Sequence, residues 1–342
     1  MCVFVSGCAN NMYEGLKPRW QDQLNESKIS FRGLCEVDKK VVWASGSGGS
    51  FARTTDGGGY WQVGKIPGAE NIDFRDIEAF NENTAIVFGI ESPAKFYKTA
   101  DGGRTWKLVY ENDTKGIFFS AAHFPNPKEG FALSDPVDGK FFIVQTRDGG
   151  DTWTMLNEQS FPVAIEGEGI FAASGTNITT TDDKKIIFVT GCTAARIFSS
   201  IDAGKSWSYV DSPFKSGAGS DGIFSIAMKD KRQGIIVGGD YTKEDTAETN
   251  AAITADGGKS WKLIEKNKPS GFRECVKYLG GSDTVITVGP NGSDISYDGG
   301  KNFEKFAPYM GLHTLAVSLD GKSVWAAGRN GLIVKLVWPD LD

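Results

Sequence analysis

A short turn pattern occurs six times along the chain, and this repetition limits the possible folds more than any other feature. Each copy has Thr or Ser, Asp two residues later, Gly four residues later and an aromatic residue seven residues later. The six aspartates are 45, 47, 54, 54 and 42 residues apart: Asp56, Asp101, Asp148, Asp202, Asp256 and Asp298. Periods of this length are typical of the four-stranded blades of β-propellers.

The chemistry of the repeated turn is structural. An Asp carboxylate accepts hydrogen bonds from backbone N–H groups of its own tight turn, and Gly adopts the positive φ angles that such turns require. The aromatic residue, Trp in five copies and Phe303 in the sixth, opens the next strand and can pack between blades. We therefore predict that the six aspartates are structural and not catalytic.

The two ends of the chain decide the number of blades. Residues 311–338 have three strands' worth of residues but no Asp turn, so their fourth strand is missing. Near the N-terminus, Arg19-Trp20-Gln21 resembles Tyr60-Trp61-Gln62, which begins a fourth strand. We predict an all-β chain with one domain, residues 18–342, a seven-bladed propeller of four-stranded blades. Residues 18–24 would complete the last blade and close the ring, which removes exposed strand edges.

The N-terminal residues predict export. Val5-Ser6-Gly7-Cys8 resembles a bacterial lipoprotein box, in which the cysteine is acylated. Residues 1–17 would then be a signal and tether, with Cys8 as the lipidation site, and the protein would be held in the periplasm or at the outer membrane of a bacterium. No Lys or Arg precedes the short apolar stretch, as one would in an ordinary signal, so a chance match remains the alternative.

Charge and composition exclude several classes of function. The net charge of −6 argues against nucleic acid as a partner, and we expect membrane contact through the lipid anchor only. With two His and no paired Cys among five, we predict no metal and no cofactor. The sequence has no G-x-S-x-G, H-E-x-x-H or P-loop motif. We expect a monomer.

The first strand of each blade lines the central channel, and its aligned positions suggest a binding site. Arginines grip carboxylates through paired hydrogen bonds, and aromatic rings stack on flat apolar surfaces. The alignment predicts a channel mouth with a cationic half and an aromatic half, made by Arg32, Arg75, Phe119, Phe171, Phe224, Arg273 and His313. Such a mouth suits an anion with an apolar or sugar-like face. Alternatively, the arginines pair with Asp76, Glu274 or Glu36 and only order the channel.

The repeated turns resemble the Asp-box, or BNR, repeat of sialidases, sortilin-type receptors and the photosystem II stability/assembly factor family. The resemblance to that last family, in its non-photosynthetic bacterial branch, covers residues 18–338. It includes the Asp-Gly-Gly-x-x-Trp turns and the segment Phe171-Ala172-Ala173-Ser174-Gly175-Thr176. It implies a propeller that binds a protein through an Arg-rich face, here Arg32, Arg75 and Arg273. Relatives are often labelled oxidoreductases, but no redox site is evident in this sequence.

We therefore predict a non-catalytic binding or assembly scaffold that takes a protein, an acidic small molecule or a glycan at the channel mouth. The alternative is a carbohydrate-active enzyme, a sialidase-like glycosidase or lyase, that uses the same mouth. Its acid, base or nucleophile would come from nearby loops: Glu166, Glu168, Asp135, Asp240 and Tyr241. However, Phe31-Arg32-Gly33-Leu34 lacks the Ile-Pro that follows this arginine in sialidases.

Overall fold

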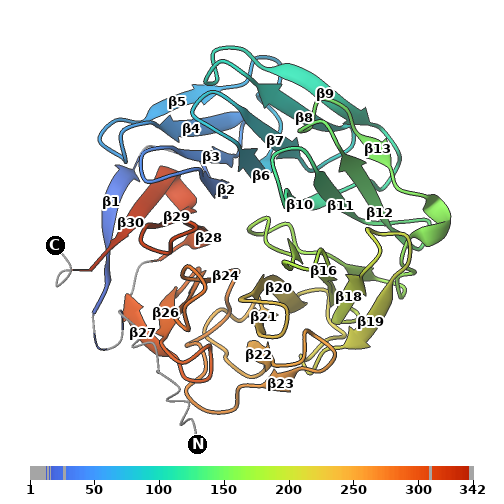
Figure 1. Ribbon diagram of the computed structural model, residues 1–342, viewed down its shortest axis with the longest axis vertical. Coiled ribbons are helices and arrows are strands. Elements are labelled where there is room, and N and C mark those ends of the chain that lie inside the picture. Colours follow the sequence, from blue (N-terminus) through green and yellow to red (C-terminus); the bar gives the residue numbers. More distant parts are fainter. Residues whose placement is uncertain (1–12, 14, 16, 26–27, 308–309, 339–342) are drawn as a thin grey trace, which may run out of the picture.

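Seven antiparallel blades of four strands each, one of them extended inward by two further short strands, stand round a central channel (Figure 1). The computed structural model describes residues 13, 15, 17–25, 28–307 and 310–338. The predicted fold is confirmed. Within these residues the helical elements are two short 3-10 turns, η1 (Glu158–Ser160) and η2 (Arg329–Gly331). No helix in this part of the chain has the length and apolar character needed to cross a bilayer.

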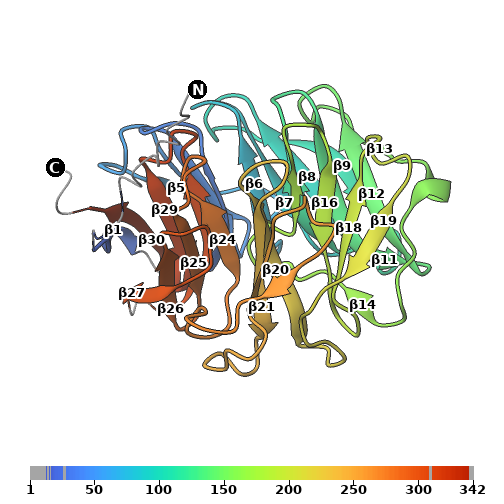
Figure 2. The same ribbon diagram turned by 60° about the horizontal axis from the view of Figure 1, so that its bottom comes forward.

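In six blades the strands follow one another outward from the channel in chain order, whereas in blade seven the outermost strand is β1 (Arg19–Asn25). The first, innermost strands stand upright round the channel, as β6, β20 and β24 show in Figure 2. These first strands are β2 (Phe31–Glu36), β6 (Phe74–Ala79), β10 (Phe119–His123), β15 (Ile178–Thr180), β20 (Asp221–Met228), β24 (Cys275–Tyr278) and β28 (Leu312–Val317).

The second strands form the centre of each blade. In β7 and in its counterparts of blades one, six and seven every residue is buried, because both faces of a blade pack against its neighbours. This burial explains their short, uninterrupted apolar runs. The second strands are β3 (Val42–Gly46), β7 (Ala85–Gly89), β11 (Gly130–Val137), β16 (Ile186–Val189), β21 (Gly234–Asp240), β25 (Val285–Gly289) and β29 (Val324–Gly328).

The third and fourth strands complete the blades. The third strands are β4 (Ser50–Thr54), β8 (Ala94–Thr99), β12 (Lys140–Thr146), β18 (Arg196–Ser200), β22 (Ala251–Thr254), β26 (Gly292–Ser296) and β30 (Leu332–Val337). The fourth strands are β5 (Gln62–Lys65), β9 (Lys107–Asn112), β13 (Thr154–Met155), β19 (Ser208–Asp211), β23 (Lys262–Leu263), β27 (Glu304–Ala307) and β1 (Arg19–Asn25).

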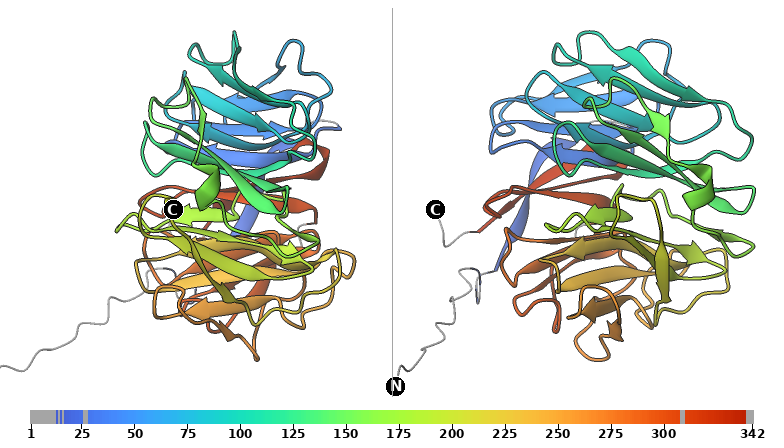
Figure 3. Two further views of the ribbon diagram at one scale, coloured as in Figure 1. Left: turned by 90° about the vertical axis from the view of Figure 1, so that its right-hand side faces the viewer. Right: turned by 45° about the vertical axis from the view of Figure 1, so that its right-hand side comes forward.

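The ring closes as predicted. Strand β1 pairs antiparallel with β30, from Arg19 opposite Val337 to Asn25 opposite Leu332, and the two lie side by side in Figure 3. Trp20 is buried and donates its indole N–H to Ser293 of blade six (2.9 Å). Tyr13, within the predicted tether, is also buried and packs on Trp338. The predicted lipidation site, Cys8, lies outside the described residues.

The tryptophans of the repeated turns wedge adjacent blades together. Trp61 of blade one meets Trp325 of blade seven edge-on, with 5.8 Å between ring centroids. Trp153 of blade three meets Phe88 of blade two at the same distance. Edge-to-face pairs of this kind stabilise the fold by about 0.5–1.5 kcal/mol each beyond the effect of the buried area.

The described cysteines are free thiols. Cys275 is buried, whereas Cys35 and Cys192 are half-buried.

In all six repeated turns the Asp carboxylate accepts the backbone N–H four residues later. Around Asp101, Thr105 donates both its N–H (2.9 Å) and its hydroxyl (2.6 Å), and Thr99 donates its hydroxyl (3.0 Å). Gly102 and Gly103 adopt φ angles of 78° and 82°.

The ring has two faces. We name the surface that carries the Asp turns the turn face. The opposite surface, which carries the loops that lead into the first strand of each blade, is the loop face.

The hydrogen bonds of the Asp turns predict a pH-dependent contribution to stability. The bonds from Thr105 lower the pKa of Asp101 to about 2. A carboxyl whose pKa is lower in the folded than in the unfolded state stabilises the fold above about pH 4, and this stabilisation is lost as the pH falls through about 2. We expect Asp101→Ala to lower the melting temperature by roughly 2–5 °C at pH 7 and by much less at pH 2, measured by calorimetry. The exposed Asp113 provides the control; an equal loss in Asp113→Ala, or a difference that persists at pH 2, would contradict the prediction.

Candidate functional site

A β-bulge at one shared position turns a side chain of the first strand toward the channel. The strand pairing skips one residue there in blades one, two, three, five and seven. Bulges of this kind commonly re-aim side chains. The skipped residues are Arg32, Arg75, Ser120, Phe224 and His313. The predicted places of Arg32, Arg75, Phe224 and His313 in the inner ring agree with this register.

Blade six has one extra residue at this point. When the blades are aligned on their Asp turns, Cys275 pairs with the second strand at the position where Gly33 pairs in blade one. The residue before it, Glu274, is therefore the equivalent of Arg32, and Arg273 is not. Glu274 reaches into the channel, where it bonds Arg32 (3.2 Å to Nη1) and His313 (2.8 Å to Nδ1). Burial alone would raise the pKa of Glu274, but His313 and Arg32 outweigh it and the pKa is lowered.

Arg273 points away from the channel and is completely buried. Its guanidinium pairs with Asp294 and also donates to Asn291 Oδ1 (2.5 Å) and Ser270 Oγ (2.7 Å). A guanidinium so enclosed has no face for a ligand. The prediction that Arg273 lines the mouth is therefore wrong. Phe272-Arg273 resembles Phe31-Arg32 in sequence, but the extra residue in blade six shifts Arg273 out of the equivalent position.

Blade four also departs from the predicted register. Its first strand, β15, begins at Ile178, and Thr176 takes the inner-ring position, so Phe171 does not lie on that strand. Instead, residues 170–177 cross the channel; we call them the channel segment. In Figure 1 this yellow-green stretch reaches toward the middle of the ring. Just before it, β14 (Glu168–Gly169) pairs with β17 (Gly191–Cys192), which extends blade five inward.

The channel segment is held by hydrogen bonds from blades on the far side of the ring. The carbonyls of Ala172, Ala173 and Ser174 accept from Arg75 (2.9 Å), Arg32 (3.1 Å) and Thr314 (3.2 Å), respectively. Further bonds join the segment to blades three, five and six. All its residues except Phe171 are buried. The segment therefore closes the channel between its two faces.

Arg32 and Arg75 keep unused donors. Arg32 makes its hydrogen bonds through Nη1 alone, and Arg75 uses Nε, toward Asp73 (2.9 Å), and Nη1. Because a guanidinium has five N–H donors, the remaining ones have no protein partner within the described residues. The side chains are 20% and 29% exposed. The sequence left open whether these arginines pair instead with Asp76, Glu274 or Glu36. Of these three, which all lie in the described part of the chain, only Glu274 pairs with one of them, Arg32. Asp76 accepts the backbone N–H groups of Ile77 and Ala122.

The aromatic part of the predicted mouth is smaller than expected. Phe171 stacks on Phe224 with 3.8 Å between centroids and 6° between planes, and the half-exposed Tyr241 meets both rings edge-on. Phe119, however, is buried between blades two and three, against Phe96. Its predicted place in the mouth is wrong, because the bulge turns the next residue, Ser120, to the channel.

The carboxylates of the enzymatic alternative do not gather round Arg32. Glu168 is buried in an ion pair with Arg196 and accepts the Thr190 hydroxyl (2.6 Å). Asp135 accepts the N–H of Ile170 (2.7 Å), and burial raises its pKa to about 6. Asp240 pairs with Lys243 (3.0 Å) beside Tyr241, at the rim of blade five, and Glu166 is exposed.

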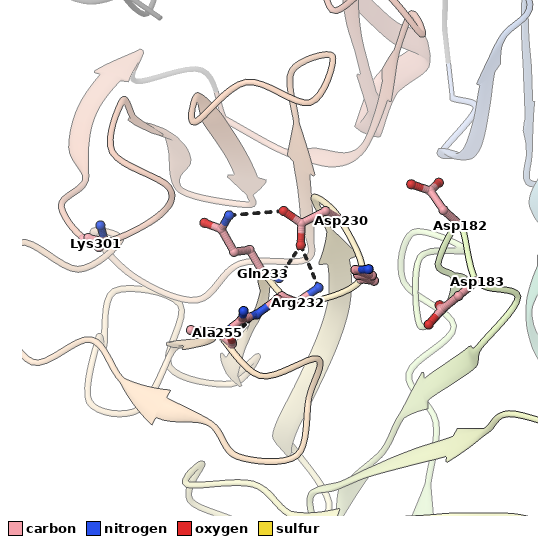
Figure 4. Close-up of a pocket in the computed structure, with 8 residues that line it drawn as sticks. Asp182, Asp183, Asp230, Arg232, Gln233, Ala255 and Lys301 are labelled. Carbon is pink, nitrogen blue, oxygen red and sulfur yellow. Dashed lines mark hydrogen bonds between the residues drawn. The ribbon is translucent and has the colours of Figure 1, made fainter. Parts of the chain in front are cut away.

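Another surface depression, of about 840 Å³, lies on the turn face between blades four, five and six. Figure 4 shows that Asp230 is held within its own loop, where it accepts the backbone N–H groups of Arg232 and Gln233. Asp182 and Asp183 lie on a separate loop. This depression therefore lacks a set of groups that converge on a ligand. Across the described part of the chain, no three His, Cys, Asp or Glu side chains gather as metal ligands would.

Comparisons with known proteins agree with the fold. A family model, Sortilin-Vps10 (sortilin, neurotensin receptor 3), matches residues 142–278. Over 113 residues, a third of this chain, the sequence is 28% identical to vacuolar protein sorting/targeting protein 10 of Fusarium vanettenii, and this match spans only 7% of that protein.

Solved propellers resemble nearly the whole chain. A structure described as YCF48 bound to D1 peptide superposes with a TM-score of 0.67 and 15% identity, over 93% of this chain and 96% of that one. YCF48 from Cyanidioschyzon merolae superposes with a TM-score of 0.65 and 17% identity, over 92% and 98% of the two chains. At these identities the likeness is one of fold.

The channel segment makes a direct prediction about stability. Gly175 has a φ of 70°, and a Cβ there would collide with the Asp76 carboxylate. We expect Gly175→Ala to lower the free energy of unfolding by about 1–3 kcal/mol, measured by urea denaturation. Gly219 has open space round it and no positive φ, so Gly219→Ala should be nearly neutral. Equal stability of the two variants would show that the segment does not pack as described.

Proposed function

We propose that this chain is a non-catalytic binding protein that docks an acidic peptide segment of a partner at the loop-face mouth of its channel. The observation that carries the proposal is the pair Arg32 and Arg75, whose unused N–H donors lie at neighbouring inner-ring positions. A carboxylate is the group that such donors recognise best. Phe171 and Tyr241 add a partly exposed aromatic surface for an apolar or ring-shaped neighbour.

Local charge balance determines how such a ligand would be recognised. Glu274 and Asp73 each pair with one of the two arginines, so the mouth has little excess positive charge. Recognition would then depend on directed hydrogen bonds, which give specificity, more than on long-range attraction. A short acidic segment beside an aromatic residue fits this arrangement better than a polyanion does.

The comparisons support a protein partner. A propeller of similar shape has been solved with a peptide bound, the D1 peptide on YCF48. The sortilin-type match covers blades four and five and parts of blades three and six, and includes the aromatic part of the mouth. We extend peptide binding to this chain on the strength of its own arginines and not of sequence identity.

The alternative, a carbohydrate-active enzyme, gains no support from its residues. Glycosidases need two carboxyl groups that flank one bond, about 5–10 Å apart. Glu168 is neutralised by Arg196, and Asp240 by Lys243. The remaining candidates, Asp135 and Glu166, make no contact with Arg32.

We also propose that Cys8 carries a lipid that holds the propeller outside the cytoplasm, and that the propeller acts there as a monomer. The lipoprotein-like sequence Val5-Ser6-Gly7-Cys8 supports the anchor. The docked Tyr13 would leave only a short tether between the lipid and the ring.

Peptide binding can be tested with a defined probe. Fluorescein-labelled acetyl-Glu-Phe-Glu-Phe-Glu should bind the wild type, and its Gln-for-Glu twin should bind far more weakly, in fluorescence anisotropy. Arg75→Ala should weaken binding roughly tenfold to a hundredfold, as expected for lost charge-assisted hydrogen bonds worth about 1.5–3 kcal/mol. Tyr241→Ala should weaken it less, because it removes one side of the aromatic surface only.

The control is Arg147→Ala, at an exposed position next to the Asp turn of blade three on the opposite face. It removes the same charge and should leave binding unchanged. Because Arg75 also holds the channel segment, the melting temperature of each variant is measured in parallel. Equal binding of the Gln twin, or an equal loss in Arg147→Ala, would rule out this mouth as the site.

Lipidation is tested by expressing the full chain in a bacterial host with radiolabelled palmitate. We expect label in the wild type and none in Cys8→Ser, since the thiol is the acceptor of the lipid. Cys2→Ser removes a cysteine from the same short segment and should stay labelled. Absence of label in the wild type would overturn the anchor.

A further inference from the structure

A second cavity lies on the other side of the channel segment and opens on the turn face. It has a volume of about 540 Å³, within the range of small-ligand sites. Residues 174–176 of the channel segment line its closed end. Its walls are polar and apolar in similar measure; the apolar part includes Phe80, Phe124 and Val317, and the fully exposed Leu319 lies at its edge.

Two carboxyl groups face this cavity from one strand. Asp76 and Glu78 are two residues apart on β6 and therefore point to the same side. Asp76, 8% exposed, accepts two backbone N–H groups. Glu78 accepts one, from Phe124 (3.3 Å to Oε1). Neither carboxyl has a Lys, Arg or His within ion-pair distance in the described ranges of the chain.

An uncompensated carboxyl in such a place is costly. Burying a carboxylate without a counter-ion disfavours its charged form. Accordingly, burial raises the pKa of Asp76 to about 7, and burial together with Asp76 raises that of Glu78 to about 8. A cation that entered the cavity would favour the charged forms of both.

The other titratable groups of the cavity supply that positive charge only in part, through Lys277. Burial keeps the Cys35 thiol neutral by raising its pKa, and lowers the pKa of His123 to about 4. Glu36, with a pKa raised to about 7 by burial, is a third acid. Lys277 of β24 also lines the cavity, and its positive charge acts to lower the pKa of both Asp76 and Glu78. It forms no ion pair with either carboxyl in the described ranges, and burial outweighs it, so both pKa values stay raised.

We propose that this cavity binds a primary ammonium group on an aliphatic stem, as presented by a lysine side chain of a peptide. The apolar part of the lining, with Phe80, Phe124 and Val317, would cover the stem, and Asp76 and Glu78 would accept hydrogen bonds from the ammonium. This site is separate from the loop-face mouth, since the channel segment lies between them. Its ligand has the opposite charge to the one proposed there.

The probe is the peptide Ala-Leu-Lys-Leu-Ala-amide with fluorescein attached to its N-terminal nitrogen, compared with a twin that has acetyl-lysine in place of lysine. Fluorescence anisotropy should show tighter binding of the lysine peptide, by roughly tenfold or more. Its affinity should rise between pH 6 and 8.5, because the carboxyls lose their protons while the lysine, with a pKa of about 10.4, stays charged. The twin should show no such rise.

Three variants separate binding from folding. Glu78→Gln should abolish most of the pH-dependent gain, whereas Glu111→Gln, on the outer strand β9 of the same blade, should leave it intact. Lys277→Met removes the one competing positive charge and should strengthen binding severalfold, an effect that damage to the fold would not produce. Equal binding of the acetylated twin, or weaker binding in Lys277→Met, would overturn the proposal.

Discussion

The pairing of β1 with β30 determines the rest of the structure, because it joins the two ends of the chain and fixes the ring at seven blades. Without that strand, blade seven would lack its outer edge and the wedge that Trp20 drives against blade six. A closed ring also fixes the distances across the channel. Arg32 of blade one can reach Glu274 of blade six only because blade seven, with His313 on the same carboxylate, holds the two at a constant separation.

The narrow channel of this ring accommodates a stretch of irregular chain. Buried backbone carbonyls need hydrogen-bond donors, and here the donors come from side chains of other blades, chiefly Arg75, Arg32 and Thr314. The two arginines therefore support the channel segment with some of their N–H groups and leave others unused. One guanidinium can perform both tasks because its donors point in several fixed directions. A lysine at either position would have one ammonium group both to hold the channel segment and to bind a ligand.

The sequence predicted the blades well, because each depends on local chemistry that the residues display. The Asp turns, the apolar second strands and the Trp20 segment each need only a few neighbouring residues to be recognised. The inner ring depends on register, which local patterns do not reveal. Phe272-Arg273 resembles Phe31-Arg32 in sequence. Because blade six has one inserted residue, however, Glu274 and not Arg273 occupies the channel position that Arg32 occupies in blade one.

The same limit explains the errors at the aromatic side of the mouth. The alignment of the repeats predicts Phe171 on an inner strand, but tertiary contacts draw it into the channel segment. The prediction for Phe119 is wrong by one residue, because a bulge turns the next residue, Ser120, toward the channel. The carboxyls Asp76 and Glu78 alternate along β6 as strand residues do, but only the closed channel makes their shared side a cavity.

The channel segment also divides the channel into two chemically different sides. On the loop face, arginines with spare donors surround the opening, whereas on the turn face two carboxyls without an ion-pair partner in the described chain line the cavity. If the channel were open, water and ions would connect the two groups and screen each from the other. Because residues 170–177 are buried and hydrogen-bonded from six blades, each side keeps its own charge environment. One narrow propeller can thus present two sites of opposite preference without a second domain.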